Sequence, residues 1–328
     1  MFVLVIQSFG EKNEYTRAIF TIWSFYAHSN QNSDSTQTIL FTDNPDYFKT
    51  YLRELPVKYV LLTPDKIREM RGEINFLHRM KIALIEEAFT ITKSSLLYAD
   101  SDSFFTKDIS AIIKELNPQV SFMHKPEYEF ESLALMRPPA AIPFHAFLNL
   151  IKNQNFTLSN NQILTASPKH FSWNAGVMLL HNTHSALIPD VYALTSQFFI
   201  PTQNHASEQY AFSIILSTHT ELKSCEEYNY HYWYRIEKKI ADKFLKIKIQ
   251  PTWGTRSFQQ KKEDVKKWTR LLPSHFKSHI FTLRDNAIQA FNENKFKQAY
   301  YFTIRALLKN PFNLLFIKDV LYHTKRLL

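Results

Sequence analysis

The residue pattern best suited to chemistry is the pair of carboxylates in Asp100-Ser101-Asp102. The pair directly follows residues 95–99, an apolar run that predicts a buried strand. Side chains at i and i+2 of an extended segment share a side, and ligands of open α/β sheets gather beyond the carboxyl ends of strands. Two carboxylates at such a place suit a hard divalent cation, Mg²⁺ or Mn²⁺, that keeps positions free for phosphate oxygens. The alternative is a solvated turn with two chance aspartates.

A second polar interruption is Trp173-Asn174-Ala175-Gly176, which precedes the apolar run 177–180. A lone glycine in a strand pattern often marks the close approach of a ligand or of another backbone. The alternative is a structural bulge that contains a buried asparagine.

Two later segments add a carboxylate, an amide and an imidazole. Glu208 and Gln209 open a predicted helix, where the helix dipole alone would also favour a glutamate. His231 lies in the aromatic run 228–234; as a strand, this run places Asn229, His231 and Trp233 on one face. His231 is therefore either a satisfied core histidine or the residue that completes a metal site with carboxylates.

The first 125 residues predict the scaffold for these groups. Strand-length apolar runs alternate there with helical periodicity: strands at 2–7, 38–42, 57–62, 95–99 and 120–124, helices at 15–26, 78–88 and 109–116. This rhythm predicts an α/β fold, with a mixed, mainly parallel sheet flanked by helices. Farther along, the pattern predicts a strand pair near 169–171 and 175–180 and helices near 186–198 and 208–216.

Composition excludes several classes of protein. The 328-residue chain has 4 Gly, too few and too scattered for a glycine-rich phosphate loop. Its single cysteine, Cys225, excludes an intrachain disulfide and a cysteine-based zinc cluster, and suits a reducing compartment. The formal net charge of +9 favours a polyanionic partner, but no nucleic-acid-binding motif accompanies it. Nucleotide phosphate and an anionic membrane surface remain as candidates.

Taken in order, these segments resemble the glycosyltransferases of the GT-A fold over residues 1 to about 235. The resemblance is closest to family-eight-like bacterial enzymes. It is carried by LLYADSDSFF and WNAGVMLL, with SEQYAFS, YHYW and LHRMKIAL in support. The H-x-G-x-x-K-P-W ending of that family is absent, and His231-Tyr232-Trp233 stands in its place.

The resemblance implies a metal-dependent glycosyltransferase, of the hexosyltransferase class. It would move a sugar from a nucleotide-diphosphosugar donor to a hydroxyl of a glycan or lipid-linked acceptor, in surface polysaccharide synthesis. The implied ligands of Mn²⁺ or Mg²⁺ are Asp100, Asp102 and His231. The implied donor contacts are Gln7, Ser8, Thr42, Asp43, Arg79, Lys81, Asp100, Ser101, Trp173 and Gly176. The implied catalytic residues are Asn174, Glu208 and Gln209. Glu208 would deprotonate the acceptor if the reaction inverts, or stabilise a cationic anomeric centre if it retains, which the resemblance favours.

Two other function classes compete with this interpretation. A phosphohydrolase of the haloacid dehalogenase type also begins with a strand and D-x-D, but Ser103 stands where that class has Thr or Val, and no later Asp-Asp pair follows. A non-enzymatic scaffold that uses a helical tail and a basic surface is the third class.

The chain divides into three expected parts. Residues 1–235 form the transferase core, 236–282 a basic segment that wraps the surface, and 283–328 a tail with the Ala/aromatic spacing of a tetratricopeptide helix pair. Lysines of 235–270, with Lys325 and Arg326, are candidates to contact an anionic membrane. We therefore expect a cytoplasmic protein, peripheral on the inner membrane face; the sequence leaves its oligomeric state open.

Overall fold

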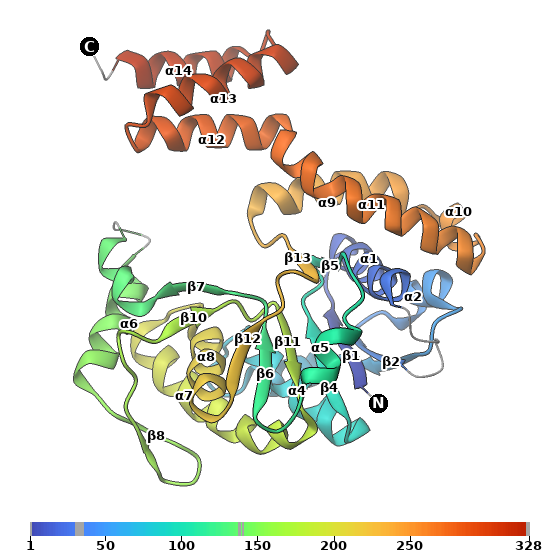
Figure 1. Cartoon of the computed structure of the whole chain (residues 1–328), viewed down its shortest axis with the longest axis vertical. Helices are drawn as coiled ribbons and strands as arrows, with labels where there is room; N and C mark the ends of the chain where they lie inside the picture. The colour runs from blue at the N-terminus through green and yellow to red at the C-terminus, as the bar shows by residue number, and fades with distance from the viewer. Residues whose placement is uncertain (1, 30–35, 137–138, 140, 326–328) are drawn as a thin grey trace.

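A computed structural model describes residues 2–29, 36–136, 139 and 141–325 of the chain (Figure 1). Its centre is a seven-stranded sheet. The strands are β1 (Phe2–Ser8), β2 (Thr36–Thr42), β3 (Val57–Leu61), β4 (Ser95–Ala99), β6 (Val120–Met123), β11 (Val177–Leu180) and β12 (Glu221–Ser224).

The order across the sheet is β12-β6-β11-β4-β1-β2-β3. Strand β1 is parallel to β2 and β4, β2 is parallel to β3, and β6 is parallel to β12, whereas β11 is antiparallel to both of its neighbours. The predicted α/β fold with a mixed, mainly parallel sheet is confirmed. Because Ile6 of β1 pairs with Ala99 of β4, Ser8 and Asp100 leave the sheet at the same edge.

Helices cover both faces of this sheet, and β1 shows why. Leu4 and Ile6 point into one core cluster, whereas Val3 and Val5 point into the other, as the alternation of a strand requires. The helices over the first face are α1 (Lys12–His28), α2 (Pro45–Leu52), α5 (Ser110–Glu115), α9 (Arg235–Lys248), α10 (Pro251–Gly254) and α11 (Phe258–Ser278). Those over the second are α3 (Pro64–Arg71), α4 (Arg79–Thr92), α6 (Ile142–Asn153), α7 (Ile188–Thr202) and α8 (Ser207–His219).

Three small strand pairs lie outside the main sheet: β5 (Ser103–Phe105) with β13 (Asn229–His231), β7 (Pro126–Glu129) with β10 (Phe171–Trp173), and β8 (Phe156–Thr157) with β9 (Ile163–Leu164). Two 3-10 helices complete this region, η2 (Phe130–Leu135) and η3 (Asn182–Leu187). The expected pairing of 169–171 with 175–180 is wrong, because β10 pairs with β7 while β11 joins the main sheet. Asn174–Gly176, between them, redirects the chain.

The basic segment and the tail are helical. Ile240 and Leu245 of α9 and Trp268 and Leu272 of α11 are buried in the same core cluster as α1. Most lysines of these helices lie on the opposite, solvated faces, except Lys261, which is buried against Glu54, and Lys238, which pairs with Asp102. The tail forms α12 (Ile280–Asn292), α13 (Phe296–Lys309) and α14 (Leu314–Lys325), which stand clear of the sheet at the end of α11 (Figure 1). The three-part division and the tetratricopeptide-like character of the tail remain predictions.

Candidate active site

The two aspartates of the D-x-D sequence lie where the sequence predicts them, in the turn between β4 and β5. The backbone holds this turn from two sides. The Asp100 amide donates to the Gly176 carbonyl at 2.7 Å, and the Tyr232 amide donates to the Asp102 carbonyl at 2.9 Å. The turn is thereby fixed between the start of β11 and the end of β13.

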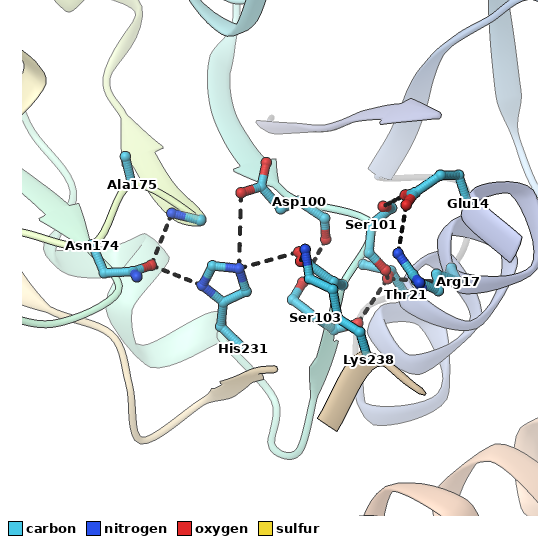
Figure 2. A network of polar contacts seen from close by, with 12 residues as sticks. Glu14, Arg17, Thr21, Asp100, Ser101, Ser103, Asn174, Ala175, His231 and Lys238 are labelled. Atoms are coloured by element: carbon cyan, nitrogen blue, oxygen red, sulfur yellow. Dashed lines mark hydrogen bonds and ion pairs between the residues drawn. The ribbon is translucent and has the colours of Figure 1, made fainter. Parts of the chain in front are cut away.

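His231 reaches the aspartates through strand pairing. In the antiparallel pair of β5 and β13, His231 lies opposite Ser103, the residue after Asp102. Its Nε2 atom lies 3.1 Å from Oδ1 of Asp102 and 3.8 Å from Oδ2 of Asp100 (Figure 2). One ligand atom from each of these three residues lies within 4.8 Å of the others. The geometry thus brings together the three residues that the resemblance implies as metal ligands, and we call them the Asp-Asp-His cluster.

Asn174 fixes the tautomer of His231. Its Oδ1 atom accepts the Gly176 amide at 3.0 Å and lies 2.8 Å from Nδ1 of His231. An atom that accepts a backbone N–H must be the amide oxygen, so Nδ1 of His231 carries a proton and donates it to Asn174. Nε2 therefore faces the two carboxylates. Because its lone pair would point at negative oxygen atoms, this nitrogen must either carry a second proton or bind a metal ion. Orienting a histidine ligand through its other ring nitrogen is the usual arrangement at metal sites.

A buried lysine stands behind Asp100. Lys81 of α4 lies 3.3 Å from Oδ2 of Asp100, 3.1 Å from Oε1 of Glu208 and 3.1 Å from the Ala175 carbonyl. Burial alone would lower the pKa of Lys81, but Asp100 and Glu208 outweigh it and raise that pKa well above its ordinary value. Burial raises the pKa of Glu208, which Lys81 opposes and Asp100 reinforces. Tyr98, whose ring lies 5.3 Å from the Lys81 ammonium, donates a hydrogen bond to Oδ1 of Asp100.

Asp102 has a second cationic neighbour. Nζ of Lys238, on α9, lies 2.5 Å from its Oδ2 atom. Burial would raise the pKa of Asp102, but His231 and then Lys238 outweigh burial and hold it well below its usual range. Asp102 is therefore a carboxylate at any physiological pH, the form that a metal ligand requires.

Gln209 is held by a hydrogen-bond network beside the cluster. Its Nε2 atom donates to Glu127 at 2.8 Å and to Ser172 at 2.9 Å, and its Oε1 atom accepts the Ala175 amide at 3.3 Å. Glu127 also accepts from Nδ2 of Asn174 at 3.0 Å. Glu127 thus connects Gln209 to Asn174 and, through it, to His231.

Two cavities meet at this cluster. The smaller, of about 360 Å³, extends from it to the end of β1. The larger, of about 840 Å³, extends the other way, past Asn174, Gly176 and Glu208. Both are lined by His78, Lys81, Asp100, Asp102 and Lys238.

The predicted nucleotide contacts Gln7 and Ser8 line the smaller cavity, with Ser101. Oε1 of Gln7 and Oγ of Ser8 are buried without a hydrogen-bond partner among the described residues, so both are available to a ligand. Ser101 instead donates to Glu14 at 2.7 Å (Figure 2).

Four predicted residues lie elsewhere. Thr42 accepts the Asn44 amide, and Asp43 accepts from the Gly10 amide and the Tyr15 hydroxyl. Neither lines the two cavities. Trp173 precedes Asn174 in the chain and points the other way, against the second core cluster.

Arg79 is the fourth. It donates to the Met70 carbonyl at 2.7 Å, and its guanidinium lies 4.5 Å from the Tyr192 ring. Positions 79 and 81 differ by about 200° around α4, so only one of the two can face the aspartates. Lys81 is that residue, and the structure directs Arg79 away from the site.

Lys238, Glu127 and Glu14 lie at the site but belong to none of the sequence motifs. Lys238 lies in a lysine-rich helix whose other lysines face solvent, so the sequence offers no way to tell it from them. Glu127 follows a proline in the region after β6, where the apolar residues show neither helical nor strand periodicity. Glu14, on α1, pairs with Arg17 at 2.5 Å, and Arg17 pairs in turn with Asp242 of α9 at 2.6 Å.

Over the described part of the chain, no helix is both long enough and apolar enough to cross a membrane.

No protein-family model and no curated protein matches the chain. Solved structures do. The apo form of mouse xyloside xylosyltransferase 1 matches at 15% identity and a TM-score of 0.42, over 68% of this chain and 83% of that one. The apo WbbM bifunctional glycosyltransferase matches at 13% identity and 0.44, over 68% of this chain and 38% of that one. The galactosyltransferase LgtC, in complex with donor and acceptor sugar analogs, matches at 12% identity and 0.43, over 65% of this chain and 70% of that one. All three are glycosyltransferases.

Proposed function

We propose that this protein is a metal-dependent glycosyltransferase. It takes a sugar from a nucleotide-diphosphosugar and transfers it to a hydroxyl of a glycan or of a lipid-linked glycan. The observation that carries the proposal is the position of the Asp-Asp-His cluster where two cavities join. A donor has two ends, and its scissile bond lies beside the diphosphate. A nucleotide in the smaller cavity and a sugar in the larger would place the diphosphate at the cluster.

The residues present fit a divalent cation. Two carboxylates and an imidazole converge within 4.8 Å, and the hydrogen bond of Nδ1 to Asn174 orients His231 so that Nε2 faces the carboxylates. Asp100, Asp102 and His231 would hold Mn²⁺ or Mg²⁺. When bound, the ion would neutralise the diphosphate and make it a better leaving group.

Two lysines would add to that charge stabilisation. Lys81 and Lys238 line both cavities and pair with Asp100 and Asp102 respectively. Lys238 keeps about a third of its side chain exposed, so it can shift from Asp102 to a phosphate oxygen. Lys81 is buried and held by three oxygens, which suits a fixed positive charge. Preorganised cations aimed at developing negative charge are the largest contributors to such reactions.

Glu208 lines the larger cavity on the sugar side of the cluster. Its carboxylate would stabilise positive charge at the anomeric carbon in a retaining reaction, the outcome that the resemblance favours. Its raised pKa suits a proton acceptor, which an inverting reaction needs. The anomeric configuration of the product, measured by NMR, distinguishes the two roles.

Gln7 and Ser8 are proposed to bind the nucleoside. Each lines the smaller cavity and has a buried polar atom that no described residue pairs with, and a base or ribose hydroxyl would satisfy it. Asp43 is proposed as an outer contact to the base, and Gln209 and Asn174 as the groups that position the sugar beside Glu208.

We further propose that the protein works on the cytoplasmic face of a membrane, in surface polysaccharide synthesis. The turn between α13 and α14 supports membrane contact. Four apolar side chains in and beside this turn are exposed: Leu308, Phe312, Leu314 and Leu315, at 79%, 87%, 70% and 72%. Lys309 and Lys318 lie near them in the sequence. Apolar side chains flanked by lysines suit an anionic bilayer surface. Of the residues first considered for this contact, Arg326 and the side chain of Lys325 lie outside the described residues.

The proposal is tested by calorimetric titration of nucleotide-diphosphosugars into the protein with and without Mn²⁺. Metal-dependent binding of a donor is the expected result.

A further inference from the structure

A third cavity, of about 830 Å³, lies where the tail meets the main body. Its walls are the start of α9, the first half of α12 and the beginning of α14. We call it the tail groove. Tyr234 lines the tail groove and also the larger cavity of the candidate active site. The two spaces are therefore adjacent, with one exposed side chain at their junction.

An aromatic path leads from the Asp-Asp-His cluster to this junction. The ring of His231 lies 5.0 Å from that of Trp233, and Trp233 stacks on Tyr234 at 4.9 Å with an interplanar angle of 29°. Tyr234 is 62% exposed, although its neighbour Tyr232 is fully buried. The exposed ring of Tyr234, backed by the half-buried ring of Trp233, offers a flat surface for the apolar C–H face of a sugar ring.

The polar lining of the tail groove suits a neutral, hydroxyl-rich ligand. It contains three basic and three acidic side chains: Arg235, Lys239 and Arg284, and Glu237, Asp285 and Asp319. These charges balance, so the groove has no net attraction for a polyanion. Gln289 donates to Asp285 at 2.8 Å, and Oγ of Thr282 is buried without a partner among the described residues. Amide, carboxylate and hydroxyl groups at one wall can each exchange hydrogen bonds with sugar hydroxyls.

We propose that the tail groove binds the inner part of the acceptor, as a neutral oligosaccharide. The accepting hydroxyl of its terminal sugar would lie in the larger cavity, the next sugar would pack on Tyr234, and earlier sugars would occupy the groove. The inference rests on the proposed function for the direction of the chain, but not for the binding itself. It gives the tail a role in choosing acceptors that are already several sugars long.

Binding of the full-length protein to an array of neutral and acidic oligosaccharides of increasing length tests the inference, without donor or metal. Array ligands that bind are then titrated by calorimetry. The expected result is a neutral oligosaccharide whose affinity exceeds that of its terminal monosaccharide. Tyr234→Ala and Gln289→Ala should each lower this affinity about tenfold, the loss of one stacking contact or of one pair of hydrogen bonds.

Ile247→Ala is the matched control. Ile247 is 72% exposed on the same helix, α9, and does not line the groove, so this variant should bind as wild type does. Thermal unfolding checks that each variant folds. If one of the two groove variants does not fold, the oligosaccharide affinity of the other still tests the inference.

The inference is overturned if no neutral oligosaccharide binds, if affinity does not rise with length, or if neither groove variant weakens binding. Donor binding with Mn²⁺, measured on the same wild-type protein, separates the two proposals. Binding of a donor but of no oligosaccharide would support the proposed function and contradict the role of the groove. Binding of oligosaccharide through the groove but of no donor would support the role of the groove and contradict the proposed function.

Discussion

The imidazole of His231 lies directly against Gly176, in the space where any other residue would carry its side chain. A Cβ atom at position 176 would lie 2.1 Å from Cε1 and 2.2 Å from Nδ1 of His231. These distances are far inside van der Waals contact, and the hydrogen bond to Asn174 keeps the ring from moving aside. The lone glycine of the WNAGVMLL segment is thus explained by the room that a metal-ligand candidate needs.

Gly176→Ala should therefore displace His231 and weaken metal binding. We expect the affinity for Mn²⁺ to fall about 10- to 100-fold, the usual cost of disturbing a ligand's support, and transfer activity to fall with it. Calorimetric titration with Mn²⁺ measures the effect. Gly254→Ala is the control, since its added methyl meets Thr50 at 3.1 Å, away from the two cavities. Equal metal affinity in wild type and Gly176→Ala would contradict this account of the cluster.

Lys238→Met should lower kcat by about 100-fold while the protein stays folded. The substitution removes a cation that lies 2.5 Å from Asp102 and lines both cavities, but keeps an unbranched side chain. Steady-state kinetics with the donor identified by calorimetry is the measurement. Lys246→Met, on the exposed side of the same helix, should be neutral. An unchanged kcat in Lys238→Met would leave Lys238 as a structural partner of Asp102 only.

The sequence predicted those parts of the site that follow a strand of regular pattern. The apolar run 95–99 places Asp100 and Asp102 at the end of β4, and the order of the motifs led to Asn174, Gly176 and His231. It did not predict Lys238 or Glu127, because both enter from elements whose position depends on tertiary packing. The choice between Arg79 and Lys81 is a matter of helical phase, which depends on which face of α4 is buried.

The basic segment was expected to wrap the surface, but its helices α9 and α11 also contribute to the core. Lysines dominate the composition of residues 235–278, yet their apolar residues recur with helical spacing and reach the core through α9 and α11. The many lysines among these apolar residues made the helical spacing hard to recognise in the sequence. The Ala/aromatic spacing of the tail, by contrast, predicts a pair of helices, and α12 and α13 occupy that stretch.

His28 predicts an acid sensitivity that is independent of the active site. Burial, followed by the nearby Lys266, Arg270 and Lys262, lowers its pKa from 6.5 to about 4, and the ring pairs with Thr269 at 2.9 Å. The unfolded chain takes up a proton below pH 6.5, whereas the folded protein resists it until about pH 4. Folding stability should therefore be lost as the pH falls through this window.

The loss from one such group cannot exceed about 1.4 kcal/mol per pH unit, and partial exposure of the ring makes it smaller. His28→Gln keeps a partner for Thr269 and removes the titration, so its melting temperature should fall less between pH 7 and 5 than that of wild type. His78, which lines the two cavities, and buried His124, with pKa values lowered to about 4 and about 3, retain part of the dependence of stability on pH. Identical pH profiles for the two proteins would contradict the assignment to His28.

The exposed turn between α13 and α14 predicts binding to anionic vesicles. Wild type should co-sediment with vesicles that contain phosphatidylglycerol, more strongly at low salt than at high salt. The double variant Phe312→Ser, Leu315→Ser should bind at least about tenfold more weakly, because two side chains no longer enter the bilayer. Ile200→Ser, at an equally apolar residue that is 59% exposed on α7, should bind as wild type does. Failure of wild type to sediment with these vesicles would contradict peripheral membrane contact.

The central claim is that the Asp-Asp-His cluster holds a metal ion that binds a nucleotide-diphosphosugar. The most direct measurement is calorimetric titration of a panel of these donors into wild type and Asp102→Asn, each with Mn²⁺ and with EDTA. Asparagine keeps the shape of the side chain but removes the charge that lies beside His231 and Lys238. The account predicts that wild type binds a donor only with Mn²⁺, and that Asp102→Asn loses this binding while it stays folded. Donor binding that is equal in EDTA, or no binding to any donor by wild type, would contradict the account and favour a scaffold or a phosphohydrolase.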